Sequence, residues 1–256
     1  MSDRVETNAS KVVLVTGASR GIGAACALLA AERGFRVVVG YRDDHAAADA
    51  VVRAIGQAGG RAVALRADVS READVLALFS AIDGEFGRLD ALVNNAGVVA
   101  PASRMVDYSL ERMRRIFDVN VLGSFLCARE ALRRMSTRLG GAGGAIVNIS
   151  SVAAKLGSPN EYVDYAASKG AIDSMTIGLS REVAAEGVRV NAGRPGLIAT
   201  EIHASGGAPD RVERLKHLVP MRRGGTAAEV AAAVLWLISE EASYVSGALL
   251  DVGGGR

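Results

Sequence analysis

Residues 12–23 read Val-Val-Leu-Val-Thr-Gly-Ala-Ser-Arg-Gly-Ile-Gly, and this stretch decides the fold. The four apolar residues at its start are typical of a strand buried on both faces of a parallel sheet. The glycines permit a tight turn and a close approach of the backbone to a phosphate, and the helix that follows would direct unpaired N–H groups at it. The stretch therefore predicts a strand, a phosphate-binding loop and a helix.

Two other interpretations of the same residues remain open. The spacing G-x-x-x-G-x-G differs from the standard G-x-G-x-x-G, and glycines alone also fit a simple tight turn. Gly17 to Gly21 match the G-x-S-x-G nucleophile elbow of α/β hydrolases. The hydrolase alternative is disfavoured because the motif follows the first strand, and because His203 and His217 fall in an irregular segment rather than at triad positions.

Strand and helix patterns alternate along the rest of the chain. This alternation predicts right-handed crossovers and a doubly wound, parallel, seven-stranded Rossmann sheet in a single α/β domain. We expect residues 1–10 to form an arm, residues 11–256 the domain, and the segment from about 197 to 225 a lid over the ligand site. Further strands are expected near 37–39, 61–66, 89–94, 145–149, 188–191 and 246–251, with helices near 44–58, 71–86, 109–138, 163–186 and 227–239.

Composition excludes several classes of protein. Thirty basic and 28 acidic residues give a net charge of +2, so no nucleic-acid partner is expected. Two cysteines and three scattered histidines predict neither a disulfide scaffold nor a metal site. The first ten residues lack the apolar core of a signal peptide, and no apolar run approaches the roughly 18 residues that cross a bilayer. We therefore expect a cytoplasmic protein with no membrane partner.

The end of the second expected strand bears on which dinucleotide binds. It reads Gly40-Tyr41-Arg42 and lacks the carboxylate that would hold both ribose hydroxyls of NAD. Arg20 and Arg42 could instead hold the 2′-phosphate of NADP from two sides. Both could equally be solvated arginines, and Asp43 and Asp44 follow at once. We expect NADP (as NADPH), with NAD as the less favoured cofactor.

Tyr165 and Lys169 are spaced four residues apart in an expected helix, so their side chains share one face. A phenol has a pKa of about 10, and a nearby ammonium lowers it. Such a tyrosine can exchange a proton with a substrate hydroxyl while a hydride moves to a nicotinamide. Lysine is scarce, with four residues in the chain, which makes the pair more informative.

With these motifs in place, residues 11–253 resemble the short-chain dehydrogenase/reductase family, in particular its bacterial glucose-dehydrogenase-like members. The resemblance rests on the glycine motif of residues 16–23, Asn94-Asn95-Ala96-Gly97, Tyr165-x-x-x-Lys169 and Pro195-Gly196. It implies that Tyr165 is the general acid/base, Lys169 its pKa-lowering partner, Ser151 the holder of the substrate oxygen, and Asn120 the residue that positions a relay water. The cofactor-binding residues it implies, together with those above, are Gly17, Ser19, Arg20, Gly21, Ile22, Gly23, Tyr41, Arg42, Asp68, Val69, Asn94, Ala96, Gly97, Tyr165, Lys169, Pro195, Gly196, Ile198 and Thr200.

One departure from the family pattern affects the serine. The segment from Ser151 to Tyr165 is one residue longer than usual, so either Ser150 or Ser151 could face the substrate. Strand alternation allows only one of them, and the motif favours Ser151. Tyr162 and His203 are further candidate substrate contacts.

Three functions are compatible with these features. The favoured one is an NADP(H)-dependent oxidoreductase acting on a small alcohol, sugar or ketone. A β-ketoacyl-acyl-carrier-protein reductase is the first alternative, because Arg129, Arg133, Arg134 and Arg138 recur near helical spacing and could dock a carrier protein. A nucleotide-binding redox sensor without turnover is the second. By resemblance, the chain would form a homotetramer.

Overall fold

Seven parallel strands form one sheet in the order β3-β2-β1-β4-β5-β6-β9. The structure is a computed structural model and describes residues 11–201, 204 and 206–256. The expected arm at residues 1–10 therefore lies outside the described residues. The strands are β1 Val12–Val15, β2 Arg36–Tyr41, β3 Ala62–Arg66, β4 Ala91–Asn94, β5 Gly144–Ile149, β6 Val188–Pro195 and β9 Leu249–Val252.

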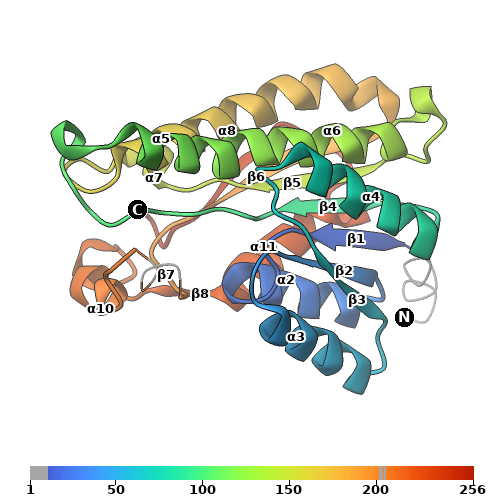
Figure 1. The fold of residues 1–256 in the computed structure, drawn as a ribbon, viewed down its shortest axis with the longest axis horizontal. Helices are drawn as coiled ribbons and strands as arrows, with labels where there is room; N and C mark the ends of the chain where they lie inside the picture. Colours follow the sequence, from blue (N-terminus) through green and yellow to red (C-terminus); the bar gives the residue numbers. More distant parts are fainter. Residues whose placement is uncertain (1–10, 202–203, 205) are drawn as a thin grey trace.

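Two layers of helices cover the sheet (Figure 1). One layer holds α4, α5, α6 and α8, and the other holds α2, α3 and α11. The doubly wound parallel sheet predicted from the sequence is confirmed. The helices are α2 Gly21–Glu32, α3 His45–Gln57, α4 Glu72–Phe86, α5 Leu110–Phe117, α6 Gly123–Met135, α7 Ala153–Leu156, α8 Val163–Val183, α10 Arg211–Leu215 and α11 Ala227–Ile238.

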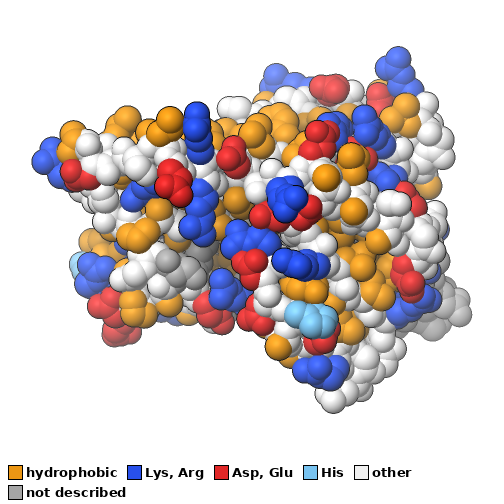
Figure 2. Space-filling model, in the orientation of Figure 1, with side chains coloured by type: hydrophobic (Ala, Val, Ile, Leu, Met, Phe, Trp, Pro, Cys, Tyr) orange, Lys and Arg blue, Asp and Glu red, His pale blue; other side chains and the backbone are white. Residues whose placement is uncertain are grey.

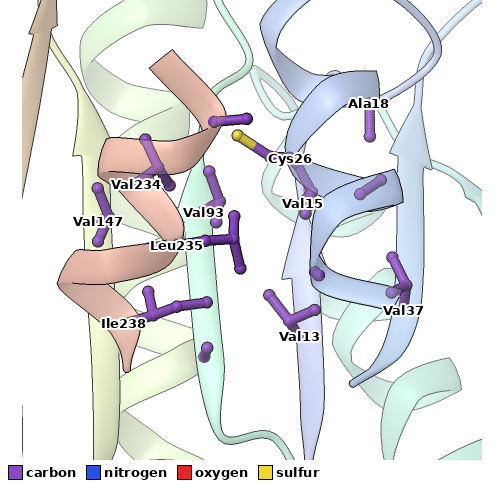
Figure 3. Close-up of a cluster of buried hydrophobic side chains, with 14 of the residues drawn as sticks. Val13, Val15, Ala18, Cys26, Val37, Val93, Val147, Val234, Leu235 and Ile238 are labelled. Carbon is purple, nitrogen blue, oxygen red and sulfur yellow. The ribbon is translucent and has the colours of Figure 1, made fainter. Parts of the chain in front are cut away.

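Alternating side chains of the strands supply the two halves of the core. In β1, Val13 and Val15 face the α2 and α11 layer, whereas Val12 and Leu14 face the α4, α6 and α8 layer. Figure 3 shows the first half, where Val234, Leu235 and Ile238 of α11 pack toward the strands beside α2. All four β1 side chains are fully buried, which accounts for the unbroken apolar run.

The chain order places a crevice at one edge of the sheet. β1 pairs with β2 on one side and with β4 on the other. The chain therefore adds β2 and β3 on one side of β1 and then crosses to β4 on the other side. Ligands in open parallel sheets bind at this switch point, beyond the carboxyl ends of the strands. The glycine loop after β1 and the Asn-Asn-Ala-Gly segment after β4 both lie there.

Two regions differ from the expected boundaries. The helical region expected at 109–138 consists of α5, a π-helical turn Asp118–Leu122 and α6, followed by the 3-10 turn Thr137–Leu139. The irregular segment after β6 contains the two-stranded sheet of β7 Ile198–Ala199 and β8 Gly225–Thr226, and the helix α10. Shorter 3-10 turns are Met105–Asp107, Ala184–Glu186, Lys216–Leu218 and Glu240–Ala242. No helix among the described residues is long and apolar enough to span a membrane.

Candidate active site

The glycine loop joins β1 to α2 and lines a cleft of about 790 Å³. Gly17 has φ +63°, a conformation that favours glycine. A Cβ at Gly23 would lie 2.4 Å from the Gly17 carbonyl oxygen, so α2 packs closely against the loop. Arg20 caps α2 without a side-chain hydrogen bond to its first turn. The first N–H groups of α2 therefore lie beside the cleft with no capping side chain, which suits a phosphate.

Asn95 anchors this loop and was not among the predicted cofactor-binding residues. Its amide nitrogen donates to the carbonyl oxygens of Thr16 at 2.8 Å and Gly17 at 3.0 Å. The Thr16 hydroxyl in turn accepts from the backbone N–H groups of Asn95 and Ala96, both at 2.9 Å. Asn94, predicted to contact the cofactor, instead donates to Ser124 and Asn148 in the buried interior. The period of the strand could have indicated that only one of two adjacent asparagines faces the cleft.

The far end of the cleft carries mixed charge. Tyr41 lies at the end of β2, and its hydroxyl pairs with Nδ1 of His45 at 2.8 Å. Arg42 donates from Nε to Asp43 at 2.6 Å, and this contact holds the pKa of the Asp43 carboxyl below its usual value. Arg66 and Arg115 lower the same pKa through their charges. Figure 2 shows basic and acidic side chains side by side between the two helical layers on this face.

Most of the predicted cofactor-binding residues lie along this cleft. The predicted cofactor-binding residues Gly23 and Asn94 do not contribute to its wall or to that of the neighbouring cavity, and neither does Asn120, which was predicted to be catalytic. The predicted residues that line the cleft are Gly17, Ser19, Arg20, Gly21, Ile22, Tyr41, Arg42, Asp68, Val69, Ala96, Gly97 and Thr200.

A second cavity of about 390 Å³ adjoins the cleft, and Ile22, Gly97 and Thr200 line both. Ser151, Tyr165 and Lys169 all lie on its wall. The Lys169 nitrogen is 5.7 Å from the centre of the Tyr165 ring. The sequence spacing thus places the phenol and the ammonium on one face of α8, as expected. Pro195, Gly196 and Tyr162 also line this cavity, while His203 lies outside the described residues.

Burial has the largest effect on the pKa values of Tyr165 and Lys169. It raises the pKa of Tyr165 to about 12, while a hydrogen bond from Ser151 acts in the opposite direction. Burial also lowers the pKa of Lys169 to about 8, and the charge of Asp173 opposes that shift. The expected lowering of the Tyr165 pKa is therefore not present in the free protein. Removal of the phenolate from water outweighs the stabilisation that neighbouring groups provide.

The two adjacent serines have different surroundings. Ser150 is buried, and its hydroxyl donates to the Lys169 carbonyl oxygen at 3.1 Å. Ser151 is partly exposed and lines the cavity, and its hydroxyl donates to the Pro195 carbonyl oxygen at 3.5 Å and accepts from the Ala153 N–H at 3.1 Å. This arrangement favours Ser151 as the serine that meets a substrate.

Asn120 lies in the π-helical turn and is fully buried. Its side-chain oxygen accepts from the Val98 N–H at 2.7 Å, and its nitrogen donates to the Val98 carbonyl and the Ser168 hydroxyl at 2.9 and 3.1 Å. The side chain therefore ties the loop after β4 to α8. Its role in a water relay stays a prediction.

Arg194, which the sequence left without a role, forms an ion pair with Asp173. The closest distance is 2.8 Å, and Arg194 also reaches Asp251 at 3.4 Å. Lys155 pairs with the same Asp251. This network joins β6, α8 and β9 behind the cavity wall, so Arg194 stabilises the site from behind rather than lining it.

Comparison with known proteins places this site in a family. A family model described as enoyl-(acyl carrier protein) reductase matches residues 17–256. The uncharacterized oxidoreductase YgfF of Escherichia coli is 56% identical over 96% of this chain and 99% of its own length. The chain belongs to the short-chain dehydrogenase/reductase family. The predicted resemblance is thereby confirmed, and the protein is an oxidoreductase of this family.

Two more members extend the comparison. Glucose 1-dehydrogenase 2 of Bacillus subtilis is 42% identical over 96% of this chain and 94% of its own. The crystal structure of 3-ketoacyl-(acyl-carrier-protein) reductase from Brucella melitensis, complexed with NADH, has a TM-score of 0.89 at 35% identity, over 96% of this chain and 98% of that one. A nicotinamide cofactor suits the cleft of this short-chain dehydrogenase/reductase, because a glycine cradle and an uncapped helix N-terminus face it.

Proposed function

We propose that the protein is an NADP(H)-dependent oxidoreductase that interconverts a small alcohol or sugar and its ketone. One observation carries this proposal. Ser151, Tyr165 and Lys169 share the wall of a cavity that adjoins the nucleotide cleft through common residues. A substrate carbonyl in the cavity would therefore meet a proton donor and the reactive end of the cofactor together.

Each of the three residues has a distinct task in this mechanism. A bound nicotinamide supplies the hydride for reduction of the carbonyl carbon. The Tyr165 hydroxyl donates its proton to the carbonyl oxygen, and the Ser151 hydroxyl donates a hydrogen bond to the same oxygen. Lys169, whose nitrogen lies near the Tyr165 ring, stabilises the phenolate that remains.

The protonation state of the free site suits the reductive direction. With a pKa of about 12, Tyr165 is a neutral phenol at pH 7 and can act as an acid without prior protonation. Lys169, with a pKa of about 8, is still mostly an ammonium at that pH. Reduction of a ketone is therefore the direction that we propose for neutral pH.

Two arginines of the cleft wall support a preference for NADPH. Arg20 and Arg42 line the cleft, and no carboxylate occupies the Tyr41 position. A 2′-phosphate would pair with these guanidinium groups. The contact of Arg42 with Asp43 acts against this preference, because the carboxylate competes with the phosphate for the same donor.

Docking of an acyl carrier protein is the less favoured alternative. Arg129 and Arg134 pair with Glu72 and Asp83 at 2.7 and 2.6 Å. Arg129, Arg133 and Arg134 also surround Glu130. Since acidic neighbours already neutralise these arginines, little positive charge remains for an acidic carrier. Turnover of an acetoacetyl thioester of carrier protein at a rate above that of free ketones would favour this alternative.

We further infer a homotetramer in the cytoplasm. Large apolar side chains on the α5 and α6 layer are exposed to a degree that is unfavourable in an isolated monomer. They are Leu110, Phe117, Leu122 and Phe125, with 39 to 57% of their surface accessible. Light scattering coupled to size exclusion tests this inference, which a monomer at micromolar concentration would contradict.

A panel of ketones and alcohols, assayed with NADPH and NADH, tests the proposed function. Reduction of at least one ketone with a lower KM for NADPH is the expected result. NADPH binding without turnover of any member would instead favour the redox-sensor alternative.

A further inference from the structure

The wall of the cavity beside Tyr165 contains both apolar and charged side chains. The apolar wall of the cavity comes from both the lid segment and the segment after β5. The residues of this wall are Val152, Leu156, Ala208, Leu215 and Leu218. At about 390 Å³ it holds a compact alicyclic or branched frame. These five side chains offer no hydrogen bonds, so they suit the carbon frame of a substrate.

The charges of three arginines act on one carboxylate of the cavity wall, that of Glu161. Arg211 of α10 donates to both oxygens of Glu161, at 2.8 and 2.7 Å, and lies 5.0 Å from the centre of the Tyr162 ring. Arg214 and Arg256 also lower the pKa of Glu161 through their charges. Arg214 is itself 3.9 Å from Asp210. The charges of Arg211 and Arg214 thus have acidic neighbours.

Arg256 differs from the other two. It lines the cavity and is partly buried. Within the described part of the chain, its guanidinium group makes no hydrogen bond and no ion pair with another side chain. A guanidinium group on a cavity wall with no protein partner can pair with a carboxylate of a ligand through charge-assisted hydrogen bonds. The Arg256 guanidinium group is therefore available to pair with the negative group of a ligand.

The loop that carries Glu161 is held in an unusual conformation. Ser158 has φ +47° and Asn160 has φ +60°, on either side of Pro159. Such conformations cost about 1 kcal/mol or more for serine and persist where function requires them. This loop belongs to the segment that is one residue longer than the family pattern. It directs Glu161 to Arg211 and so fixes the guanidinium group at the cavity wall.

Resting on the proposed function, we propose that the substrate is a keto acid with a compact apolar frame. Its carbonyl would lie at Tyr165, and its carboxylate would bind Arg256 beside Arg211. Guanidinium and carboxylate groups pair through two parallel hydrogen bonds, which would orient the frame. The carboxylate takes no part in the reaction: hydride reaches the carbonyl carbon, and the Tyr165 proton reaches the oxygen.

Matched acids and esters test this assignment. The holoenzyme is assayed with NADPH on 3-oxocyclohexanecarboxylate, 3-oxocyclopentanecarboxylate and levulinate, and on the methyl ester of each. We expect kcat/KM to be at least about tenfold higher for each acid than for its methyl ester, because only the acid can form the charge-assisted pair with Arg256. The gain should lie mainly in KM, because the carboxylate is bound equally before and during the reaction.

The Arg256→Gln variant is the direct test, and Arg53→Gln on the exposed face of α3 is its matched control. Arg256→Gln should raise KM for the acids about tenfold and bring the acid-to-ester ratio toward one, while Arg53→Gln keeps the wild-type ratio. Thermal unfolding of both variants checks that they fold. Equal use of acids and esters by the wild type, or an unchanged ratio in Arg256→Gln, overturns the carboxylate assignment and leaves the oxidoreductase function intact. If neither acids nor esters nor any other ketone is reduced, the proposed function itself fails.

Discussion

The Lys169 ammonium donates a 2.7 Å hydrogen bond to the carbonyl oxygen of Ile149, the last residue of β5. This contact holds the side chain of an α8 residue against the end of the central sheet. The Lys169 nitrogen also lies 3.5 Å from where a Cβ of Gly97 would be. The ammonium thus lies between the sheet, the loop after β4 and the Tyr165 ring, at the wall of the cavity.

Lys169→Arg should therefore abolish most turnover although it keeps the positive charge. The planar guanidinium is larger than an ammonium and cannot reproduce the position of the Lys169 nitrogen between Ile149 and Gly97. We expect kcat to fall by about 10²-fold or more. Steady-state kinetics with NADPH measures this, and near-normal kcat would show that the compact ammonium is not required.

Lys169→Met should stabilise the fold at pH 7 while it removes activity. Burial lowers the Lys169 pKa to about 8, so below that pH the folded protein keeps a charge that its surroundings disfavour. The pKa shift corresponds to a loss of roughly 3 kcal/mol of folding stability, which the variant would regain. The variant also loses the hydrogen bond to Ile149, which costs about 1 kcal/mol. The unfolded lysine titrates near 10.5, so the wild-type penalty disappears as the pH rises from about 8 to 10.5.

Urea unfolding of wild type and Lys169→Met at pH 7 and pH 10 measures the difference in their free energies of unfolding. The variant should be more stable at pH 7, and its advantage should shrink or reverse at pH 10. A variant that is less stable at pH 7, with a difference that does not change with pH, would contradict the account.

Alanine substitution separates the roles of the two serines. Ser151→Ala removes a hydroxyl that lies on the cavity wall and lowers the pKa of Tyr165, so kcat should fall roughly 10²- to 10³-fold. Ser150→Ala removes a buried bond to the Lys169 carbonyl and should cost about 1 kcal/mol of stability with kcat largely kept. The assignment is wrong if the two variants show the reverse pattern.

Cofactor preference should move in opposite directions at two adjacent residues. Asp43→Asn frees the Arg42 guanidinium and removes a charge that repels a 2′-phosphate, so the ratio of kcat/KM for NADPH over NADH should rise severalfold. Arg42→Ala should lower that ratio by about tenfold. Asp49→Asn, on α3 outside the cleft wall, is the control and should leave it unchanged. A lower wild-type KM for NADH than for NADPH would contradict the assignment.

Local patterns were enough to predict the fold. The apolar run at Val12–Val15 and the glycines after it predicted β1, the loop and α2, because buried parallel strands and tight turns restrict residue type strongly. The π-helical turn around Asn120 was not predictable, because neighbouring residues along the chain do not distinguish it from an α-helix.

The site was predictable where its residues are close in sequence. Tyr165 and Lys169 lie four residues apart on one helix, so their shared face follows from the helical period. The pairs Arg211–Glu161 and Arg194–Asp173 join residues 50 and 21 positions apart, and only the tertiary structure brings them together. The raised pKa of Tyr165 likewise depends on burial by segments that are distant in sequence, so it could not be predicted from the spacing of Tyr165 and Lys169.

The most direct test of the proposed mechanism compares wild type with Tyr165→Phe. Both proteins are titrated with NADPH by fluorescence and then assayed on the ketone panel. The mechanism predicts that the wild type reduces at least one ketone, and that Tyr165→Phe binds NADPH with similar affinity but has a kcat lower by about 10²- to 10⁴-fold. Turnover by Tyr165→Phe at the wild-type rate would show that Tyr165 is not the proton donor.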